Sequence, residues 1–221
     1  MSVADGAAVP DRSPTWYAVD GRVIGARARR TRQRLLDTTE ALLDEHGITG
    51  LKVVDITQRV GTSPATFYQY FNDVEGAILA LAAEVGEHEL ELIELVSPAW
   101  SEPGGLGAVT AYVRAYQQLW DRHRSVLRTR NLRSEEGDER FQEVRARSSI
   151  PMAEALGSLV SDAVTAGDLD TELEPFTTGA AMLGMLERLF VYRKTFRIRG
   201  ITDDDVCHTL AAILHRTVTG R

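Results

Sequence analysis

Hydrophobic residues recur every three or four positions along most of the chain, which is the spacing of one face of an α-helix. Strand-like alternation of apolar and polar residues is missing from the sequence, and no segment repeats. The pattern therefore predicts an all-α fold of about nine helices. The expected helices cover residues 27–46, 53–60, a short segment from 64, 72–96, 106–123, 124–133, 138–166 with an interruption near Pro151, 175–193 and 203–218.

Changes in composition divide the chain into three expected parts. Residues 1–25 contain Gly, Ala, Pro and Ser without periodicity and are predicted to be a disordered leader. Residues 26–72 are predicted to form a three-helix domain, and residues 73–221 a larger helical domain. Asn72 with Glu75 resembles a capping box, which is expected to open the fourth helix.

The sequence between the second and third helices predicts a tight turn. Val53 and Val60 belong to an apolar face, and Gly61 follows, a residue that adopts the positive φ with which many helices end. Ser63 suits the N-cap of the next helix, and Pro64 suits its first turn. The segment is typical of a helix-turn-helix.

The third helix is predicted to face inward through Phe67 and Phe71, which are four residues apart. Hydroxyl and amide groups remain for the opposite side, where they can donate to phosphates and base edges. These residues are Thr66, Tyr68, Gln69 and Tyr70. Two packed amphipathic helices in an ordinary bundle are the alternative, but the capped turn and the polar face together favour DNA as the partner.

The block from Ser63 to Phe71 resembles the DNA-reading segment of the TetR family of bacterial repressors, and the similarity covers residues 30–85. The Thr-Phe-Tyr-x-Tyr-Phe core is most similar to that of actinobacterial repressors of the ethionamide-resistance type. The resemblance implies DNA contacts from Ser63, Pro64, Ala65, Thr66, Tyr68, Gln69 and Tyr70, with a further backbone contact from Thr57. Gln69 is the expected base reader, because its amide can pair bidentately with adenine.

One position departs from the family. Many relatives place a lysine near the start of the fourth helix, where this chain has Val74, so that phosphate contact is in doubt. The peptide N–H groups at that helix start are an alternative phosphate site.

The net charge of −7 is unusual for a DNA-binding protein, but its distribution is uneven. Residues 22–75 hold eight Lys and Arg against seven Asp and Glu, whereas the segments on either side are acidic. Four arginines of the first helix are expected to contact the DNA backbone: Arg27, Arg29, Arg30 and Arg32. The alternative for this run is a solvated charged segment.

The second domain carries apolar faces that admit two interpretations, ordinary core or the walls of a ligand cavity. The family implies a cavity for a small apolar effector, and the candidate residues are Tyr112, Tyr116, Trp120, Met152, Leu156, Leu183 and Phe190. It also implies a homodimer formed by the last two helices, with contacts from Met182, Leu186, Val206, Leu210, Ile213 and Leu214. Two-fold symmetry would then require a pseudo-palindromic operator.

Several classes of function lack support in the sequence. No apolar run is long enough for a membrane span, and the N-terminus does not resemble a secretory signal, so a cytoplasmic protein is expected. Cys207 is the single cysteine and is expected to be a buried apolar residue. Glu84, His88 and Glu91 share a helix face, but without further His or Cys residues a solvated surface is favoured over a metal site. Two alternatives to a DNA-binding regulator stay open. One is a helical small-molecule-binding protein with an inactive DNA-binding head. The other, an enzyme, is the weaker alternative, because the sequence has no cofactor motif and no clustered catalytic residues.

Overall fold

The computed structural model describes residues 25–169 and 172–220, and the expected leader falls outside these residues except for Gly25. The all-α prediction is confirmed, because the described residues form nine α-helices and four short 3-10 helices without a strand. The α-helices are α1 (Ala26–His46), α2 (Val53–Val60), α3 (Pro64–Tyr68), α4 (Val74–Glu91), α5 (Leu106–Arg122), α6 (Arg124–Glu135), α7 (Glu139–Ala166), α8 (Pro175–Phe196) and α9 (Asp203–Thr219). The 3-10 helices are η1 (Ile48–Gly50), η2 (Leu92–Leu95), η3 (Pro98–Trp100) and η4 (Arg197–Arg199).

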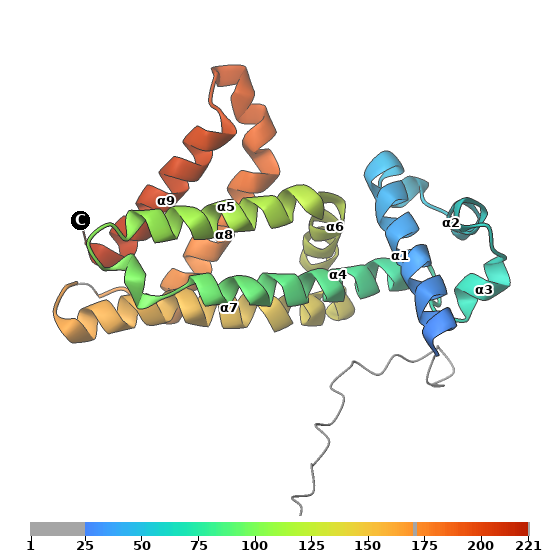
Figure 1. Cartoon of the computed structure of the whole chain (residues 1–221), viewed down its shortest axis with the longest axis horizontal. Helices are drawn as coiled ribbons and strands as arrows, with labels where there is room; N and C mark the ends of the chain where they lie inside the picture. Colours follow the sequence, from blue (N-terminus) through green and yellow to red (C-terminus); the bar gives the residue numbers. More distant parts are fainter. Residues whose placement is uncertain (1–24, 170–171, 221) are drawn as a thin grey trace, which may run out of the picture.

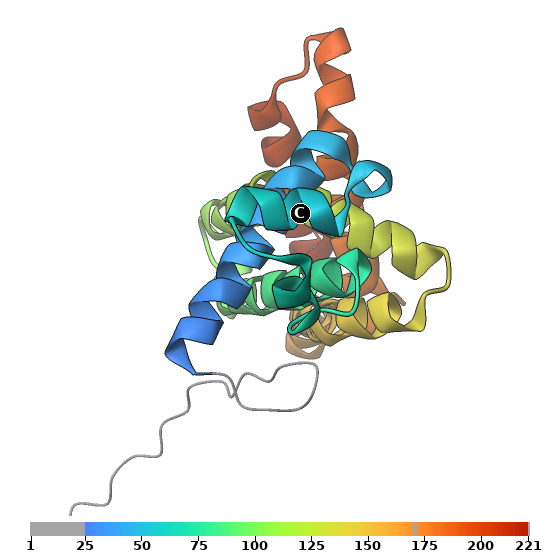
Figure 2. The same ribbon diagram turned by 90° about the vertical axis from the view of Figure 1, so that its right-hand side faces the viewer.

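Helices α1 to α3 lie at one end of the molecule, and α4 runs from this end into the rest of the fold (Figure 1). There α4 lies beside α7, while α5 packs against α9, and α8 packs mainly against α7. The view along the long axis looks onto α1, α2 and α3 (Figure 2). Because α4 contacts α1 as well as α6 and α7, it connects the two parts of the fold.

Two glycines explain how closely α7 and α8 pack. A Cβ atom at Gly157 would lie 2.4 Å from the carbonyl oxygen of Pro175, and one at Gly179 would lie 2.0 Å from that of Ala153. Any side chain would therefore force the two helix backbones apart. The contact places α8 across α7, where both contribute to one continuous apolar core.

The prediction of an Asn72–Glu75 capping box is wrong. The N-cap of α4 is Asp73, whose carboxylate accepts a hydrogen bond from the Gly76 N–H at 2.6 Å. The α-helix also ends at Glu91, and η2 continues the chain where the sequence predicted further α-helix to about Val96. A capping side chain one position further on is an equally good acceptor, so residue type alone did not fix the register.

Pro151 lies inside α7 without dividing it, although the sequence suggested an interruption there. At the start of α9, Thr202 and Asp205 form a reciprocal capping box. No helix in the described part of the chain has both the length and the apolar content needed to cross a membrane.

Candidate nucleic-acid interface

The turn between α2 and α3 has the geometry that the sequence indicated. Gly61 adopts φ 74° and ψ 43°, a left-handed conformation that favours glycine. The N–H of Thr62 then donates back to the Thr57 carbonyl at 2.9 Å. Ser63 begins α3, and its hydroxyl accepts a hydrogen bond from the Thr66 N–H at 3.3 Å. The turn thus fixes the direction in which α3 leaves α2.

Two phenyl rings hold α3 on the core. Phe67 and Phe71 are both buried, and their ring centroids lie 5.4 Å apart. Tyr68 packs edge-on against Phe67 with a centroid separation of 5.8 Å, but 52% of its surface remains exposed. The α-helix ends at Tyr68, earlier than the polar pattern suggested, so Gln69 and Tyr70 lie in the turn that follows.

Most of the predicted contact residues form one exposed edge. Ser63, Pro64, Ala65, Tyr68 and Gln69 are exposed, and Thr66 and Tyr70 are half-buried. Thr57 is placed differently. It is buried in α2, and its hydroxyl donates to the Val54 carbonyl at 3.1 Å, so its side chain faces the protein.

The four predicted arginines of α1 fall into two groups. Arg27, Arg29 and Arg30 are exposed near the start of the helix. Arg32 is instead largely covered, because its guanidinium pairs with Glu84 of α4 at 3.0 Å and lies 5.3 Å from the centroid of the Phe71 ring. Arg32 therefore fastens α1 to α4, whereas the other three present their charge to solvent.

Two further arginines fix the position of α2. Helical periodicity predicted this role for neither of them. Arg34 donates to the carbonyl oxygen of Val60 at 2.7 Å, at the end of α2. Arg59 pairs bidentately with Glu45 at 2.6 and 3.0 Å, and this pairing lowers the pKa of the Glu45 carboxyl. Both pairs join residues well separated along the chain, so helical periodicity did not reveal them.

The start of α4 does not match the expectation that its peptide N–H groups are free to bind a phosphate. The Asp73 carboxylate already occupies the exposed N–H of Gly76, which places a negative charge where a phosphate would have to approach. Val74 is half-buried and packs against the core. The physical reason for the departure from the family pattern is thus a self-capped helix start.

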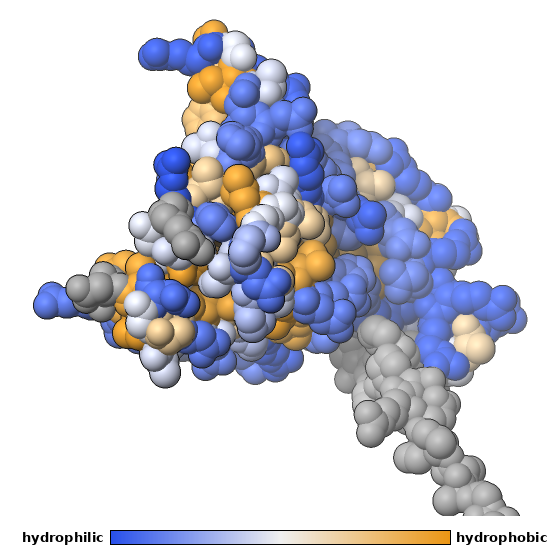
Figure 3. Space-filling view, turned by 60° about the vertical axis from the view of Figure 1, so that its left-hand side comes forward, coloured by the Kyte–Doolittle hydropathy of each residue, from blue (hydrophilic) through white to orange (hydrophobic). Residues whose placement is uncertain are grey.

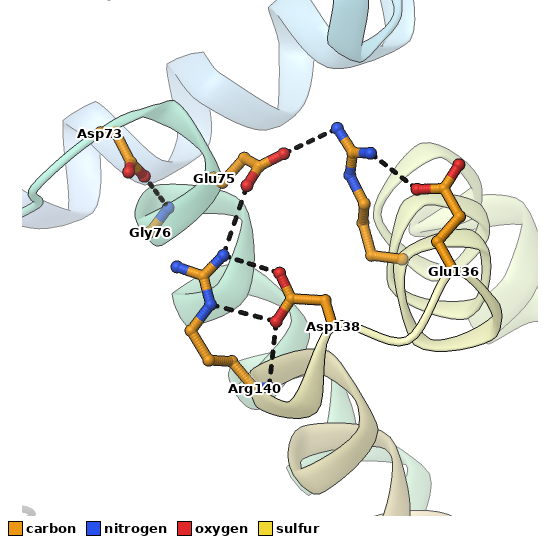
Figure 4. A network of polar contacts seen from close by, with 7 residues as sticks. Asp73, Glu75, Gly76, Glu136, Asp138 and Arg140 are labelled. Carbon is orange, nitrogen blue, oxygen red and sulfur yellow. Dashed lines mark hydrogen bonds and ion pairs between the residues drawn. The ribbon is translucent and has the colours of Figure 1, made fainter.

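A network of ion pairs connects this helix start to α6 and α7 (Figure 4). Glu75 in the first turn of α4 lies 2.7 Å from Arg133 of α6 and 3.3 Å from Arg140 of α7. Arg140 also binds Asp138 at 2.7 Å, and the Arg140 guanidinium lowers the pKa of that carboxyl to about 2. The helix that follows the helix-turn-helix is therefore tied by charge to the second part of the fold.

A second ionic cluster lies fully inside the molecule. Arg130 of α6 binds Glu89 of α4 at 2.5 and 3.1 Å and lies 3.7 Å from Glu187 of α8. Burial disfavours the charged guanidinium, but the Glu89 and Glu187 carboxylates raise the pKa of Arg130 above its ordinary value. Ser148 of α7 donates to Glu89 at 2.7 Å, so four helices meet at one group of charges.

The seven residues predicted to line a ligand cavity are all buried, and they come together from α5, α7 and α8. The Tyr112 hydroxyl donates to the Met152 sulfur at 3.3 Å, and the Tyr116 ring stacks 6.1 Å from that of Phe190. They form an aromatic cluster, defined as Tyr112, Tyr116, Trp120, Met152, Leu156, Leu183 and Phe190. A large open groove of about 1120 Å³ lies elsewhere, and none of these seven residues lines it.

The predicted dimer contacts also lie largely inside the subunit. Met182, Leu186, Val206, Leu210 and Leu214 are buried, and Ile213 alone of this set is exposed, at 40%. Other apolar side chains are exposed where α8 passes into α9, including Ile198 at 86% and Ile201. Figure 3 shows hydrophobic residues beside hydrophilic ones on this protruding end.

The remaining candidates have ordinary surroundings. Glu84 is the partner of Arg32, and His88 stacks on His123 with a centroid separation of 5.8 Å. Across residues 25–169 and 172–220, no group of His, Cys, Asp and Glu has the arrangement of a metal site. Cys207 is buried as expected, and burial raises the pKa of its thiol.

Comparison with known proteins gives two matches to family models. Residues 35–81 match the model described as bacterial regulatory proteins, tetR family, and residues 90–221 match the tetracyclin repressor-like C-terminal domain. No curated protein matches the chain.

Similar solved structures share the fold at low sequence identity. A TetR/AcrR-family transcriptional regulator from Thermobifida fusca is 21% identical, with a TM-score of 0.60 over 84% of this chain and 97% of that one. GusR from Salmonella enterica is 16% identical, with a TM-score of 0.65 over 87% and 96%. FadR from Bacillus subtilis, solved with stearoyl-CoA, is 14% identical, with a TM-score of 0.61 over 86% and 98%.

Proposed function

Since the chain belongs to the TetR family of bacterial regulatory proteins, and is a DNA-binding transcription regulator rather than an enzyme, we propose that it is a homodimeric repressor released from its operator by a small apolar effector. The observation that carries the proposal is the exposed edge from Ser63 to Gln69, held by Phe67 and Phe71. A helix end that is anchored in this way and carries exposed hydroxyl and amide groups suits the major groove.

Gln69 is proposed as the base reader, and Ser63, Thr66 and Tyr68 as contacts to phosphates or bases. Pro64 and Ala65 would lie against the groove at the amino end of α3, and Tyr70 would flank it. The Gln69 amide is exposed and has no hydrogen bond to another residue in the described part of the chain, so it is available for bidentate pairing with adenine.

The exposed arginines at the start of α1 are proposed as phosphate contacts. Arg27, Arg29 and Arg30 lie near the amino end of a helix, whose dipole disfavours cations in the first turn, where Arg27 lies, by about 0.3–1 kcal/mol. Their position is therefore not explained by helix stability. The amino end of α1 and α3 also lie at the same end of the molecule in both views (Figures 1 and 2), as a common DNA surface requires.

The homodimer is proposed to form through α8 and α9, with Ile213 and the apolar residues between these helices at the contact. The buried residues Met182, Leu186, Val206, Leu210 and Leu214 would support this surface from within. Two copies related by a two-fold axis would read a pseudo-palindromic operator with half-sites about 35 Å apart. The proposed location is the cytoplasm, where the operator DNA of a bacterial cell is found.

The effector is proposed to act on the second part of the fold and to move α4. The aromatic cluster offers an apolar surface for it, although in this structure its seven side chains are buried in the continuous apolar core. FadR from Bacillus subtilis, with its bound stearoyl-CoA, supports a lipophilic effector by analogy. A hundredfold preference for the released conformation would supply about 2.7 kcal/mol of coupling.

The test is to select binding sites from genomic DNA and to measure affinity for a selected site as salt is raised. A repressor that neutralises several phosphates loses affinity steeply with salt, because counterions are released on binding. The rival function, a small-molecule-binding protein with an inactive head, would yield no enriched sequence.

A further inference from the structure

The open groove of about 1120 Å³ has walls from both parts of the fold. Residues 43–49, from the end of α1 to η1, form one wall next to the helix-turn-helix. The other walls come from α6, between Arg124 and Glu135, and from α8, between Gly184 and Lys194. The volume is slightly above the upper end of the range for small-molecule sites, roughly 300–1,000 Å³, so the groove has room for such a ligand.

Cations outnumber available anions in this groove. Arg124, Arg128, Arg188 and Lys194 line it, and none of them pairs with a carboxylate in the described parts of the chain. Arg124 donates to the Val191 carbonyl at 2.6 Å; burial, and then the charge of Arg128, lower its pKa. Four cations therefore stand against three carboxylates, Asp44, Glu135 and Glu187, among the residues that line the groove, which leaves it with a net positive charge.

The acidic side chains of the groove do not balance this charge. Asp44 and Glu135 also line the groove and are exposed, as Arg128, Arg188 and Lys194 are. Glu187 is buried, and it is already engaged by Arg145 at 2.8 Å and by Arg130 at 3.7 Å. Its charge is thus used within the fold.

Apolar surface lies beside the cations. Leu132 of α6 is 48% exposed and Tyr192 of α8 is 45% exposed, and both line the groove together with Ile48. The guanidinium of Arg188 lies 4.8 Å from the centroid of the Tyr192 ring, which places a charge at the edge of an apolar wall. Large exposed apolar side chains next to unpaired cations suit a ligand with two chemical ends.

We propose that this groove binds an amphipathic anion, with a carboxylate or phosphate head at the arginines and an apolar tail along Leu132 and Tyr192. The site is separate from the aromatic cluster and is not part of the proposed DNA surface. The binding itself is independent of the proposed function, while its effect on DNA rests on that function.

The effect on DNA follows from what the groove touches. The groove does not include Arg130, but the same helix α6 carries it, and Arg130 binds Glu89 of α4 in the core; a ligand that shifts α6 therefore acts on α4. The wall at residues 43–49 includes the end of α1, and α1 packs against α2. A ligand held between the two walls fixes the helix-turn-helix relative to the second part of the fold.

The experiment measures binding of decanoate to the full-length protein by calorimetry, without DNA. Decanol and decyltrimethylammonium have the same chain length but a neutral and a cationic head. We expect decanoate to bind at least about tenfold more tightly than either, and we expect affinity to rise about threefold to fourfold for each CH₂ from octanoate to dodecanoate.

Two variants locate the site. An added Cβ at Gly184 meets no atom within 4 Å, so a side chain can begin there without displacing the backbone, and Gly184→Leu is expected to occupy space in the groove. Gly107 in α5 is equally free and lies outside the groove, so Gly107→Leu is the matched control. We expect Gly184→Leu and Arg128→Glu each to weaken decanoate binding at least about tenfold, and Gly107→Leu and Arg147→Glu to leave it unchanged.

Equal binding of the cationic probe, or undiminished decanoate binding by both groove variants, would overturn the proposal. The mass of each variant in solution provides a further check. If Gly184→Leu alone converts a dimer into a monomer, a second copy of the chain fills the groove and the proposal is also overturned. If the wild-type protein binds decanoate but selects no operator, the proposed function alone would be overturned.

Discussion

The carboxylate of Glu75, in the first turn of α4, lies 2.7 Å from the guanidinium of Arg133 on α6. Glu75 lies only four residues after Phe71, the last buried residue of the helix-turn-helix segment. The pair therefore joins the end of the helix-turn-helix to the second part of the fold. Arg140 of α7 reinforces it at 3.3 Å. The start of α4, directly after the helix-turn-helix, is thus tied by charge to α6 and α7.

We expect Glu75→Gln to weaken operator binding severalfold, because a loosened α4 leaves more conformational freedom to be lost on DNA. The pair is partly exposed, so the free energy of unfolding should change by less than about 1 kcal/mol. Operator titration and urea unfolding of the same variant measure the two effects. The control is Glu143→Gln, which breaks an exposed pair with Arg147 on α7; equal operator affinity for the two variants would refute this role of Glu75.

The arginines of α1 should appear in the salt dependence of DNA binding. We expect Arg29→Gln to reduce the slope of log affinity against log salt by about 0.9, the value for one released phosphate contact. Arg147→Gln removes the same charge on an exposed part of α7 and should leave the slope unaltered. An unchanged slope for both would mean that α1 carries only a solvated charged face.

The buried cluster around Arg130 predicts a large effect on stability. Arg130→Met leaves Glu89 without its guanidinium partner, and an unpaired buried charge costs about 3–5 kcal/mol. Adding Glu89→Gln removes that charge and should recover part of the loss. Urea unfolding of the single and double variants provides the comparison, and a double variant no more stable than Arg130→Met would argue against unpaired charge as the cause.

Asp138 predicts a defined pH dependence. Its pKa is lowered from 3.8 to about 2, chiefly by its hydrogen bonds with Arg140, so the ionised form is favoured in the folded protein. This contribution to stability is present above the unfolded pKa and is lost as pH falls from about 4 to about 2. Asparagine is also a good N-cap, so Asp138→Asn removes the charge while keeping the cap. The stability difference between wild type and Asp138→Asn should shrink across this pH window, and a constant difference would exclude the carboxylate charge as its source.

The sequence predicted best where the signal is local. Gly61, Ser63, Phe67 and Phe71 lie within eleven residues, and each restricts the backbone or the core directly, so the turn and the buried rings followed from residue type. The capping residue of α4 was misplaced by one position, since neighbouring Asn72 and Asp73 are both suitable caps.

Helical periodicity did not predict contacts between residues that are distant in the sequence. Arg130 and Glu89 are 41 positions apart, and nothing in the helical pattern pairs them. Periodicity marked Leu186 and Leu210 as apolar but did not distinguish a subunit's own core from a partner's surface, and both are buried within the subunit. The excess of cations in the groove likewise depends on how α6 and α8 meet.

The most direct test of the account is the affinity of the Tyr68→Ala/Gln69→Ala protein for an operator recovered by selection. Both side chains are exposed, and Phe67 and Phe71 remain to hold the fold, so the melting temperature should stay close to that of the wild type. The control is Gln118→Ala, at an exposed position on α5. We expect the double variant to lose at least about tenfold in operator affinity. A folded double variant that binds the operator as tightly as the wild type would contradict the account.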